Sequence, residues 1–96
     1  MSKTMKDLQR AHITYSGNVQ GVGFRFTARD VAARMGVSGF ARNLGSGDVE
    51  VVCEGTGEQV RSFVRDLGES MREYIADSKI DTSLAVGEFT SFEIRF

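Results

Sequence analysis

The sequence predicts an α+β sandwich, in which two helices cover one face of an antiparallel sheet. Three observations support this fold class. Short segments in which apolar and polar residues alternate are separated by two segments with helical spacing of apolar residues. Glycine-rich stretches separate most of these segments, as expected of turns in a chain without proline. The length of 96 residues is enough for one hydrophobic core.

The first half of the chain predicts two strands around one helix. Apolar residues alternate with polar ones over residues 11–15, which indicates a half-buried strand. From Phe24 to Met35 the apolar residues recur at intervals of three and four, and Gly36 follows as a C-terminal cap. Residues 37–43 form the second predicted strand, and the glycine turn after it ends that strand.

The second half predicts a third strand followed by the second helix. Apolar residues alternate with charged ones over residues 49–54. Gly55-Thr56-Gly57 is expected to interrupt this strand, with Thr56 as the N-cap of a helix. The apolar residues between Val60 and Leu67 then form one stripe of that helix.

The last part of the chain predicts two further strands. The pattern is weak over residues 71–86, where Tyr74, Ala76 and Ile80 indicate a strand interrupted by polar residues. Alternating apolar residues over 89–96 predict a terminal strand. The order is therefore β-α-β-β-α-β plus a C-terminal strand. Because each crossover is right-handed, both helices pack on one face of the sheet, which is a ferredoxin-like arrangement.

Composition narrows the expected class of protein. We expect a single domain over residues 10–96, preceded by a flexible polar tail over residues 1–9. A net charge of −1 argues against a nucleic-acid partner, and no apolar run is long enough for a membrane span. A single cysteine excludes an intramolecular disulfide and fits a reducing compartment. We therefore expect a cytoplasmic protein that has no membrane partner, and we take it to be a monomer.

The most informative stretch of the sequence is the loop at residues 16–25, Ser-Gly-Asn-Val-Gln-Gly-Val-Gly-Phe-Arg. Gly17, Gly21 and Gly23 allow sharp backbone turns that expose several N–H groups. The predicted helix begins just afterwards, so its unpaired amides and dipole favour an anion there. Arg25 is placed to close this cradle with a planar cationic group. The alternative is a glycine-rich turn followed by a surface arginine.

A second candidate residue, Asn43, ends the second predicted strand just before a glycine turn. A carboxamide accepts and donates hydrogen bonds at once, which suits it to orienting a water molecule. The alternative is an asparagine chosen for turn geometry. Arg42 precedes it and is expected at the surface, where its charge would add to the positive potential of the site.

Two motifs resemble those of the acylphosphatase family. The family's phosphate loop reads Gly-x-Val-Gln-Gly-Val-x-Phe-Arg, and it is matched by Gly17, Val19, Gln20, Gly21, Val22, Phe24 and Arg25. A second, separate pattern is matched by Gly39, Phe40, Asn43, Gly47, Val49 and Gly55. The resemblance covers residues 11–67 and the ending at 92–96. It departs over residues 70–87, and Tyr15 stands where an aliphatic residue is commoner.

This resemblance implies hydrolysis of the carboxyl–phosphate bond of small acyl phosphates, without a metal or another cofactor. The backbone amides of the loop would bind the phosphate, namely those of Gln20, Gly21, Val22, Gly23, Phe24 and Arg25. The Arg25 side chain would compensate the phosphate charge, and Asn43 would orient the attacking water. Inorganic phosphate would be the product and a competitive inhibitor.

Other interpretations have weaker support in the sequence. Cys53 alternates with apolar strand residues and lacks the Cys-x5-Arg spacing of a cysteine phosphatase, so a buried thiol is expected. His12 lies among strand residues, where a solvated or hydrogen-bonded histidine is commoner than a catalytic one. A non-catalytic RNA-binding or anion-sensing module on the same fold is the main alternative, and a role in carbamoyl-group chemistry is a third.

Overall fold

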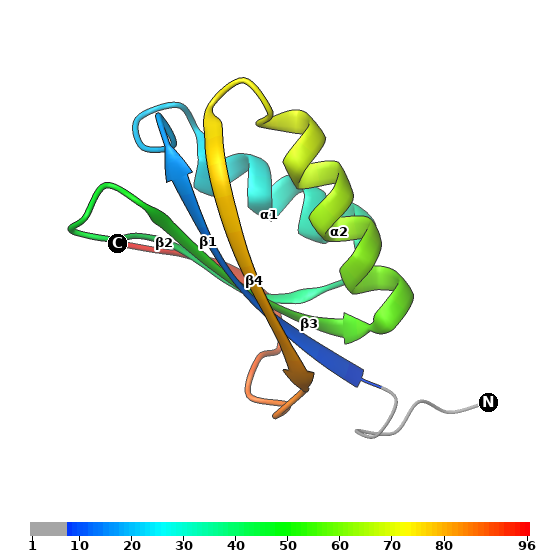
Figure 1. Cartoon of the computed structure of the whole chain (residues 1–96). Helices are drawn as coiled ribbons and strands as arrows, with labels where there is room; N and C mark the ends of the chain where they lie inside the picture. The colour runs from blue at the N-terminus through cyan, green and yellow to red at the C-terminus, as the bar shows by residue number, and fades with distance from the viewer. Residues whose placement is uncertain (1–7) are drawn as a thin grey trace.

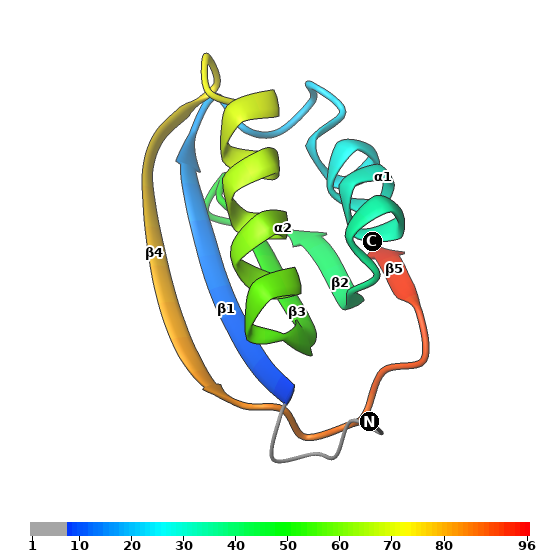
Figure 2. The ribbon, with the colours of Figure 1, turned by 90° about the vertical axis from the view of Figure 1, so that its right-hand side faces the viewer.

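The computed structural model describes residues 8–96, which form one five-stranded sheet with two helices on one face (Figure 1). The elements are β1 (Leu8–Gly17), α1 (Phe24–Met35), β2 (Ser38–Asn43), β3 (Val49–Thr56), α2 (Gly57–Ser70), β4 (Ile75–Leu84) and β5 (Phe92–Arg95). Figure 2 shows α1 and α2 beside each other on the same face of the sheet. Of the predicted tail over residues 1–9, Leu8 and Gln9 belong to β1, and residues 1–7 lie outside the described residues.

The sheet confirms the predicted α+β class and element order, with one correction. The strand order is β4-β1-β3-β2-β5, and all neighbours are antiparallel except β2 and β5, which are parallel. The sheet is therefore mixed and not wholly antiparallel as predicted. The reason lies in the connection after β4. That strand ends where β2 begins, so the chain crosses to the far edge and β5 runs in the same direction as β2.

The core lies between the sheet and the two helices, as the apolar patterns predict. Its largest fully buried side chains include Phe63 and Leu67 from α2 and Ile13 from β1. Cys53 is also completely buried, and burial raises the pKa of its thiol to about 12. The thiol therefore stays protonated and packs as a small apolar group, as expected from its place on β3.

The predicted helix ends are confirmed, whereas the predicted end of β3 is wrong by about two residues. Gly36 caps α1 in the left-handed conformation with φ of 74°. Thr56 Oγ1 accepts a hydrogen bond from the Gln59 amide at 3.1 Å, and Gln59 Oε1 accepts one from the Thr56 amide at 2.9 Å. β3 nevertheless continues through Gly55, because Gly55 pairs with Gln9 of β1. Gly55 is thus a strand residue.

The two edge strands account for the weak patterns near the C-terminus. β4 is continuous from Ile75 to Leu84, and its side chains are almost all exposed. Because neither set of side chains is buried in the core, the sequence of β4 shows no clear alternation of apolar and polar residues. β5 is only four residues long, and Phe89 lies outside it. The Phe89 ring instead packs on Phe40 at a centroid distance of 5.9 Å, on the face of the sheet away from the helices. None of the helices described over residues 8–96 is long and apolar enough to cross a membrane.

A buried carboxylate, Glu54, fastens the connection between β4 and β5 to the sheet. Its side chain is only 5% exposed. It accepts hydrogen bonds from the backbone amides of Val86 at 2.9 Å and Gly87 at 3.1 Å, and it pairs with Arg10 at 3.2 Å. These bonds satisfy a carboxylate that burial would otherwise penalise. They also hold the crossing segment that sets the direction of β5.

A second carboxylate on the face away from the helices, Glu50, is paired with two basic side chains. Glu50 lies 2.6 Å from Arg42 Nη2 and 2.9 Å from His12 Nε2. Partial burial raises the pKa of Glu50, but the hydrogen bonds from His12 and Arg42 outweigh it, so that the pKa is lowered overall. A carboxylate with a lowered pKa stabilises the fold at neutral pH and loses that contribution as the pH falls through the folded value.

We therefore expect Glu50→Gln to lower the free energy of unfolding at pH 7, and the difference from the wild type to shrink at pH values below the ordinary pKa of 4.5. Urea unfolding at pH 7 and at about pH 3.5 measures this. The control is Glu73→Gln, a substitution of an exposed residue in the turn after α2. An equal loss of stability at both pH values would contradict the prediction.

Candidate active site

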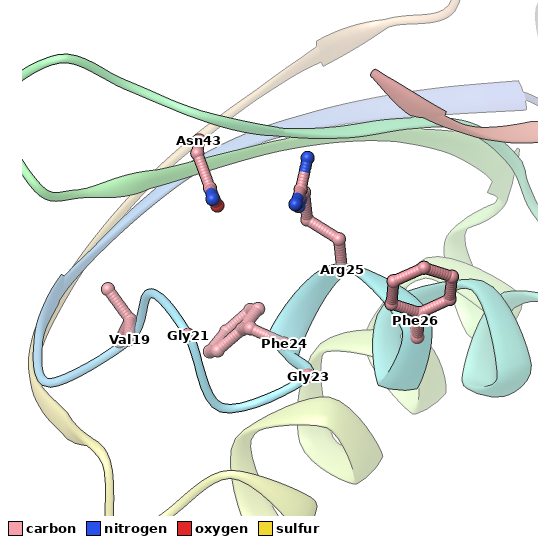
Figure 3. A pocket seen from close by; sticks show the side chains of 7 residues that line it. All are labelled: Val19, Gly21, Gly23, Phe24, Arg25, Phe26 and Asn43. Atoms are coloured by element: carbon pink, nitrogen blue, oxygen red, sulfur yellow. The ribbon is translucent and has the colours of Figure 1, made fainter. Parts of the chain in front are cut away.

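One hollow of about 200 Å³ lies between the loop that joins β1 to α1 and the end of β2. Its lining residues are Val19, Gly21, Gly23, Phe24, Arg25, Phe26 and Asn43. Figure 3 shows Arg25 from α1 and Asn43 from β2 reaching into the same space above the loop. Of the residues predicted for the site, Gln20 and Val22 do not line the hollow, and the others meet there.

The sheet register explains why Asn43 lies near the loop. Val49 of β3 pairs with Tyr15 of β1 on one side and with Asn43 of β2 on the other. The loop after β1 and the last residue of β2 therefore lie at the same end of the sheet, about two strand spacings apart (~10 Å). Asn43 shares its face of β2 with the buried Ala41, which packs beneath the helices.

The loop that forms the floor of the hollow depends on left-handed glycines. Gly21 and Gly23 have φ values of 77° and 76°, although a Cβ at either position would meet open space. Glycine is therefore needed there for the backbone angle and not for room. Gly23 is also the N-cap of α1, and it provides no side chain to cap the helix. The first amides of the helix therefore have no capping side chain as a hydrogen-bond partner.

These amides are hydrogen-bond donors without a backbone acceptor among the described residues. The first helical hydrogen bond runs from the Thr27 amide to the Gly23 carbonyl at 3.0 Å. Within residues 8–96, no amide from Gln20 to Phe26 donates to a backbone carbonyl. The first turn of α1, which is fully described, also has no acidic side chain. The positive end of the helix dipole and its amides therefore face the hollow without compensation.

Two apolar side chains hold the loop at its ends. Val19 is completely buried, and Phe24 is 2% exposed with its ring 4.8 Å from that of Tyr15. The phenylalanine of the motif therefore anchors the start of α1 in the core. Tyr15 stands where an aliphatic residue is commoner in the family, and its aromatic ring packs against Phe24.

The side chain of Gln20 connects the loop to the turn beside Asn43. Its Nε2 donates to the carbonyls of Leu44 at 2.8 Å and Asp48 at 2.9 Å. The turn is closed by the Leu44 amide, which donates to the Asp48 carbonyl at 2.8 Å. The sequence predicts only a backbone role for Gln20, because nothing in the sequence shows which carbonyls its carboxamide reaches.

Arg25 is oriented by the end of the chain. Its Nη1 donates to the Arg95 carbonyl at 2.9 Å, and its guanidinium carbon lies 4.7 Å from the centroid of the Phe96 ring. One bond and one stacking contact therefore position a group that has five N–H donors. The sequence does not show this contribution of β5, because it depends on the parallel pairing of β5 with β2.

Two residues predicted near or outside the site lie on the opposite face of the sheet. Arg42 pairs with Glu50 there. The expectation that its charge adds to the positive potential of the site is therefore wrong. Strand alternation explains the difference, since neighbouring residues of β2 point to opposite faces. His12 also contacts Glu50 and takes no part in the hollow, as expected.

A family model described as acylphosphatase matches residues 11–94. The chain belongs to the acylphosphatase family. This match confirms the resemblance that the two motifs indicate. Acylphosphatases are hydrolases that act on acid anhydrides. The match includes residues 70–87, where the chain departs from the commoner pattern.

Individual relatives support the same assignment. An acylphosphatase of Anaeromyxobacter sp. is 40% identical over 92 residues, which are 95% of this chain and 99% of that protein. The crystal structure of the Bacillus subtilis acylphosphatase has a TM-score of 0.83 at 26% identity and covers 92% of this chain and 99% of that one. The structure of HypF from T. kodakarensis matches with a TM-score of 0.78 at 28% identity, over 92% of this chain but only 12% of HypF.

We expect Gln20→Ala to lower kcat/KM for benzoyl phosphate by roughly tenfold and the free energy of unfolding by about 1–2 kcal/mol, because two hydrogen bonds between the loop and the turn are lost. Benzoyl phosphate hydrolysis and urea unfolding measure the two effects. Gln9→Ala, an exposed glutamine near the start of β1 and far from the loop, is the matched control. If the two variants behave alike, the Gln20 side chain does not position the loop.

Proposed function

We propose that this protein hydrolyses the carboxyl–phosphate bond of acyl phosphates at the hollow between the loop and β2. The observation that carries the proposal is the convergence of three groups on one small space: the free amides at the start of α1, the Arg25 guanidinium and the Asn43 carboxamide. Water adds to phosphorus, the bond to the acyl oxygen breaks, and the products are a carboxylate and inorganic phosphate.

The loop and Arg25 bind the phosphate. The amides from Gln20 to Arg25 donate to its non-bridging oxygens, and the helix dipole favours its negative charge. Arg25 uses one donor on the Arg95 carbonyl and keeps the others for the phosphate. Each charge-assisted hydrogen bond contributes roughly 1.5–3 kcal/mol. A preoriented cation and fixed amides also stabilise charge that spreads over these oxygens in the transition state.

Asn43 orients the attacking water in line with the leaving group. Its carboxamide oxygen accepts a hydrogen bond from the water and holds the water beside the phosphate, so the contribution of Asn43 is made to the reaction and not to the binding of phosphate. Among the described residues, the lining of the hollow contains no His, Asp or Glu. The proton of the water therefore goes to the phosphate itself, whose carboxylate leaving group needs no acid.

The same groups provide the charge compensation that a metal ion provides in other phosphoryl transfers. Arg25 and the loop amides act on the oxygens that Mg²⁺ would otherwise contact. The proposed mechanism therefore needs no metal and no other cofactor. We also propose that the protein works as a monomer in the cytoplasm, with inorganic phosphate as a competitive inhibitor that binds the same loop.

Substitutions of the two polar side chains are expected to have different effects. Arg25→Gln weakens both inhibition by inorganic phosphate and turnover, because the phosphate loses its cationic partner. Asn43→Ala leaves inhibition by phosphate nearly unchanged and lowers kcat by about 10²–10³-fold, which is typical for loss of one oriented transition-state donor. Steady-state hydrolysis of benzoyl phosphate, with and without inorganic phosphate, measures both.

The controls for these variants are Arg72→Gln, in the exposed turn after α2, and Asn18→Ala, an exposed residue of the loop that does not line the hollow. Both are expected to keep wild-type rates. Full activity of Asn43→Ala would rule out its role in orienting water.

Removal of divalent ions provides a separate test of the mechanism. We expect benzoyl phosphate hydrolysis to continue at the same rate after prolonged treatment with EDTA, because Arg25 and the loop amides bind the phosphate without a metal. The comparison is with the same sample after Mg²⁺ is added back. Strong inhibition by EDTA that Mg²⁺ reverses would contradict the metal-independent mechanism.

A further inference from the structure

An exposed aromatic ring, Phe26, stands at the rim of the hollow without a role in the core. Its side chain is 48% exposed, although α1 buries Phe24 and Ala28 on its inner face. The exposed large apolar residues within the described part of the chain are Phe26, Ile80, Leu84, Val86 and Phe96. Of these, Phe26 alone lines the hollow.

The position of Phe26 relative to the reacting groups is well defined. It follows Arg25 directly in α1, and in Figure 3 Arg25 lies between Asn43 on one side and Phe26 on the other. The guanidinium carbon of Arg29 lies 5.2 Å from the centroid of the Phe26 ring. This contact comes from the next turn of the helix, so Arg29 packs against the ring from the same face of α1.

The proposed reaction fixes the direction in which the acyl group leaves. In phosphoryl transfer the attacking and leaving oxygens lie roughly in line through phosphorus. If Asn43 holds the water, the acyl oxygen points to the opposite side, which is the side of Phe26. The phosphate and the water occupy the polar end of the hollow, so the acyl group extends toward the rim.

The size of the hollow supports the same conclusion. Its volume of about 200 Å³ is smaller than the roughly 300–1,000 Å³ of sites that enclose a drug-sized ligand. The hollow therefore encloses the phosphate end of a substrate, and a large acyl group rests on the surface beside it. The surface available there is the aromatic face of Phe26.

We propose that Phe26 forms an apolar subsite for the acyl group and gives the enzyme a preference for aryl acyl phosphates over small aliphatic ones. This inference rests on the proposed acyl phosphate hydrolysis. The aryl ring of the substrate packs against Phe26 in an offset or edge-to-face arrangement, while the phosphate end is bound as described above. Burial of Phe26 then occurs only when substrate is present.

The test compares benzoyl phosphate with acetyl phosphate, which share the reacting bond and differ in the acyl group. For Phe26→Ala we expect the ratio of kcat/KM for benzoyl phosphate to that for acetyl phosphate to fall roughly threefold to tenfold, as expected for loss of one aromatic contact. Phe26→Tyr, which keeps the ring, is expected to retain the wild-type ratio. Leu84→Ala, an exposed apolar residue on β4, is the matched control for loss of exposed apolar surface.

The possible outcomes separate this inference from the function on which it rests. A wild type that hydrolyses both substrates, with a ratio that Phe26→Ala leaves unchanged, overturns the subsite and leaves the proposed function standing. An equal loss on both substrates also overturns the subsite, because Phe26 would then act on the phosphate end. A wild type that hydrolyses neither substrate overturns the proposed function and the subsite together.

Discussion

The geometry of the candidate site depends on one register constraint, the pairing of Val49 with Tyr15 on one side and with Asn43 on the other. It brings the loop that follows β1 to the end of β2, although residues 18–23 of the loop and Asn43 are far apart in sequence. A shift by one residue would turn Asn43 to the opposite face of the sheet. The core beneath β1 and β2 opposes such a shift, because Ile13 and Ala41 would have to leave it.

Side chains then refine what the register brings together. Gln20 joins the loop to the turn after β2. The end of β5 contacts the start of α1 through the hydrogen bond from Arg25 to the Arg95 carbonyl. Both contacts use backbone carbonyls as acceptors, so they depend on chain position more than on the identity of the residues contacted. The site is therefore assembled from three separate segments, and each of them is held by the sheet.

The two faces of the sheet carry different kinds of side chain. The face under the helices provides the core and Asn43, whereas the opposite face has paired charges, among them Glu50 with Arg42 and Glu54 with Arg10. The amides at the start of α1 and the Arg25 guanidinium lie on the other face, on the side of the hollow.

The amino-acid sequence by itself determined the local features of this protein. These include the apolar periods of both helices, the cap at Thr56 and the left-handed glycines of the loop, since each depends on residues near it in the chain. Two separated motifs also identified the family and named Arg25 and Asn43 as site candidates. Tertiary structure decided what depends on distant partners, namely the parallel direction of β5, the buried anchor at Glu54 and the carbonyls that Gln20 and Arg25 reach. Short-range patterns do not encode these contacts, because pairing between strands and the path of a crossing connection settle them.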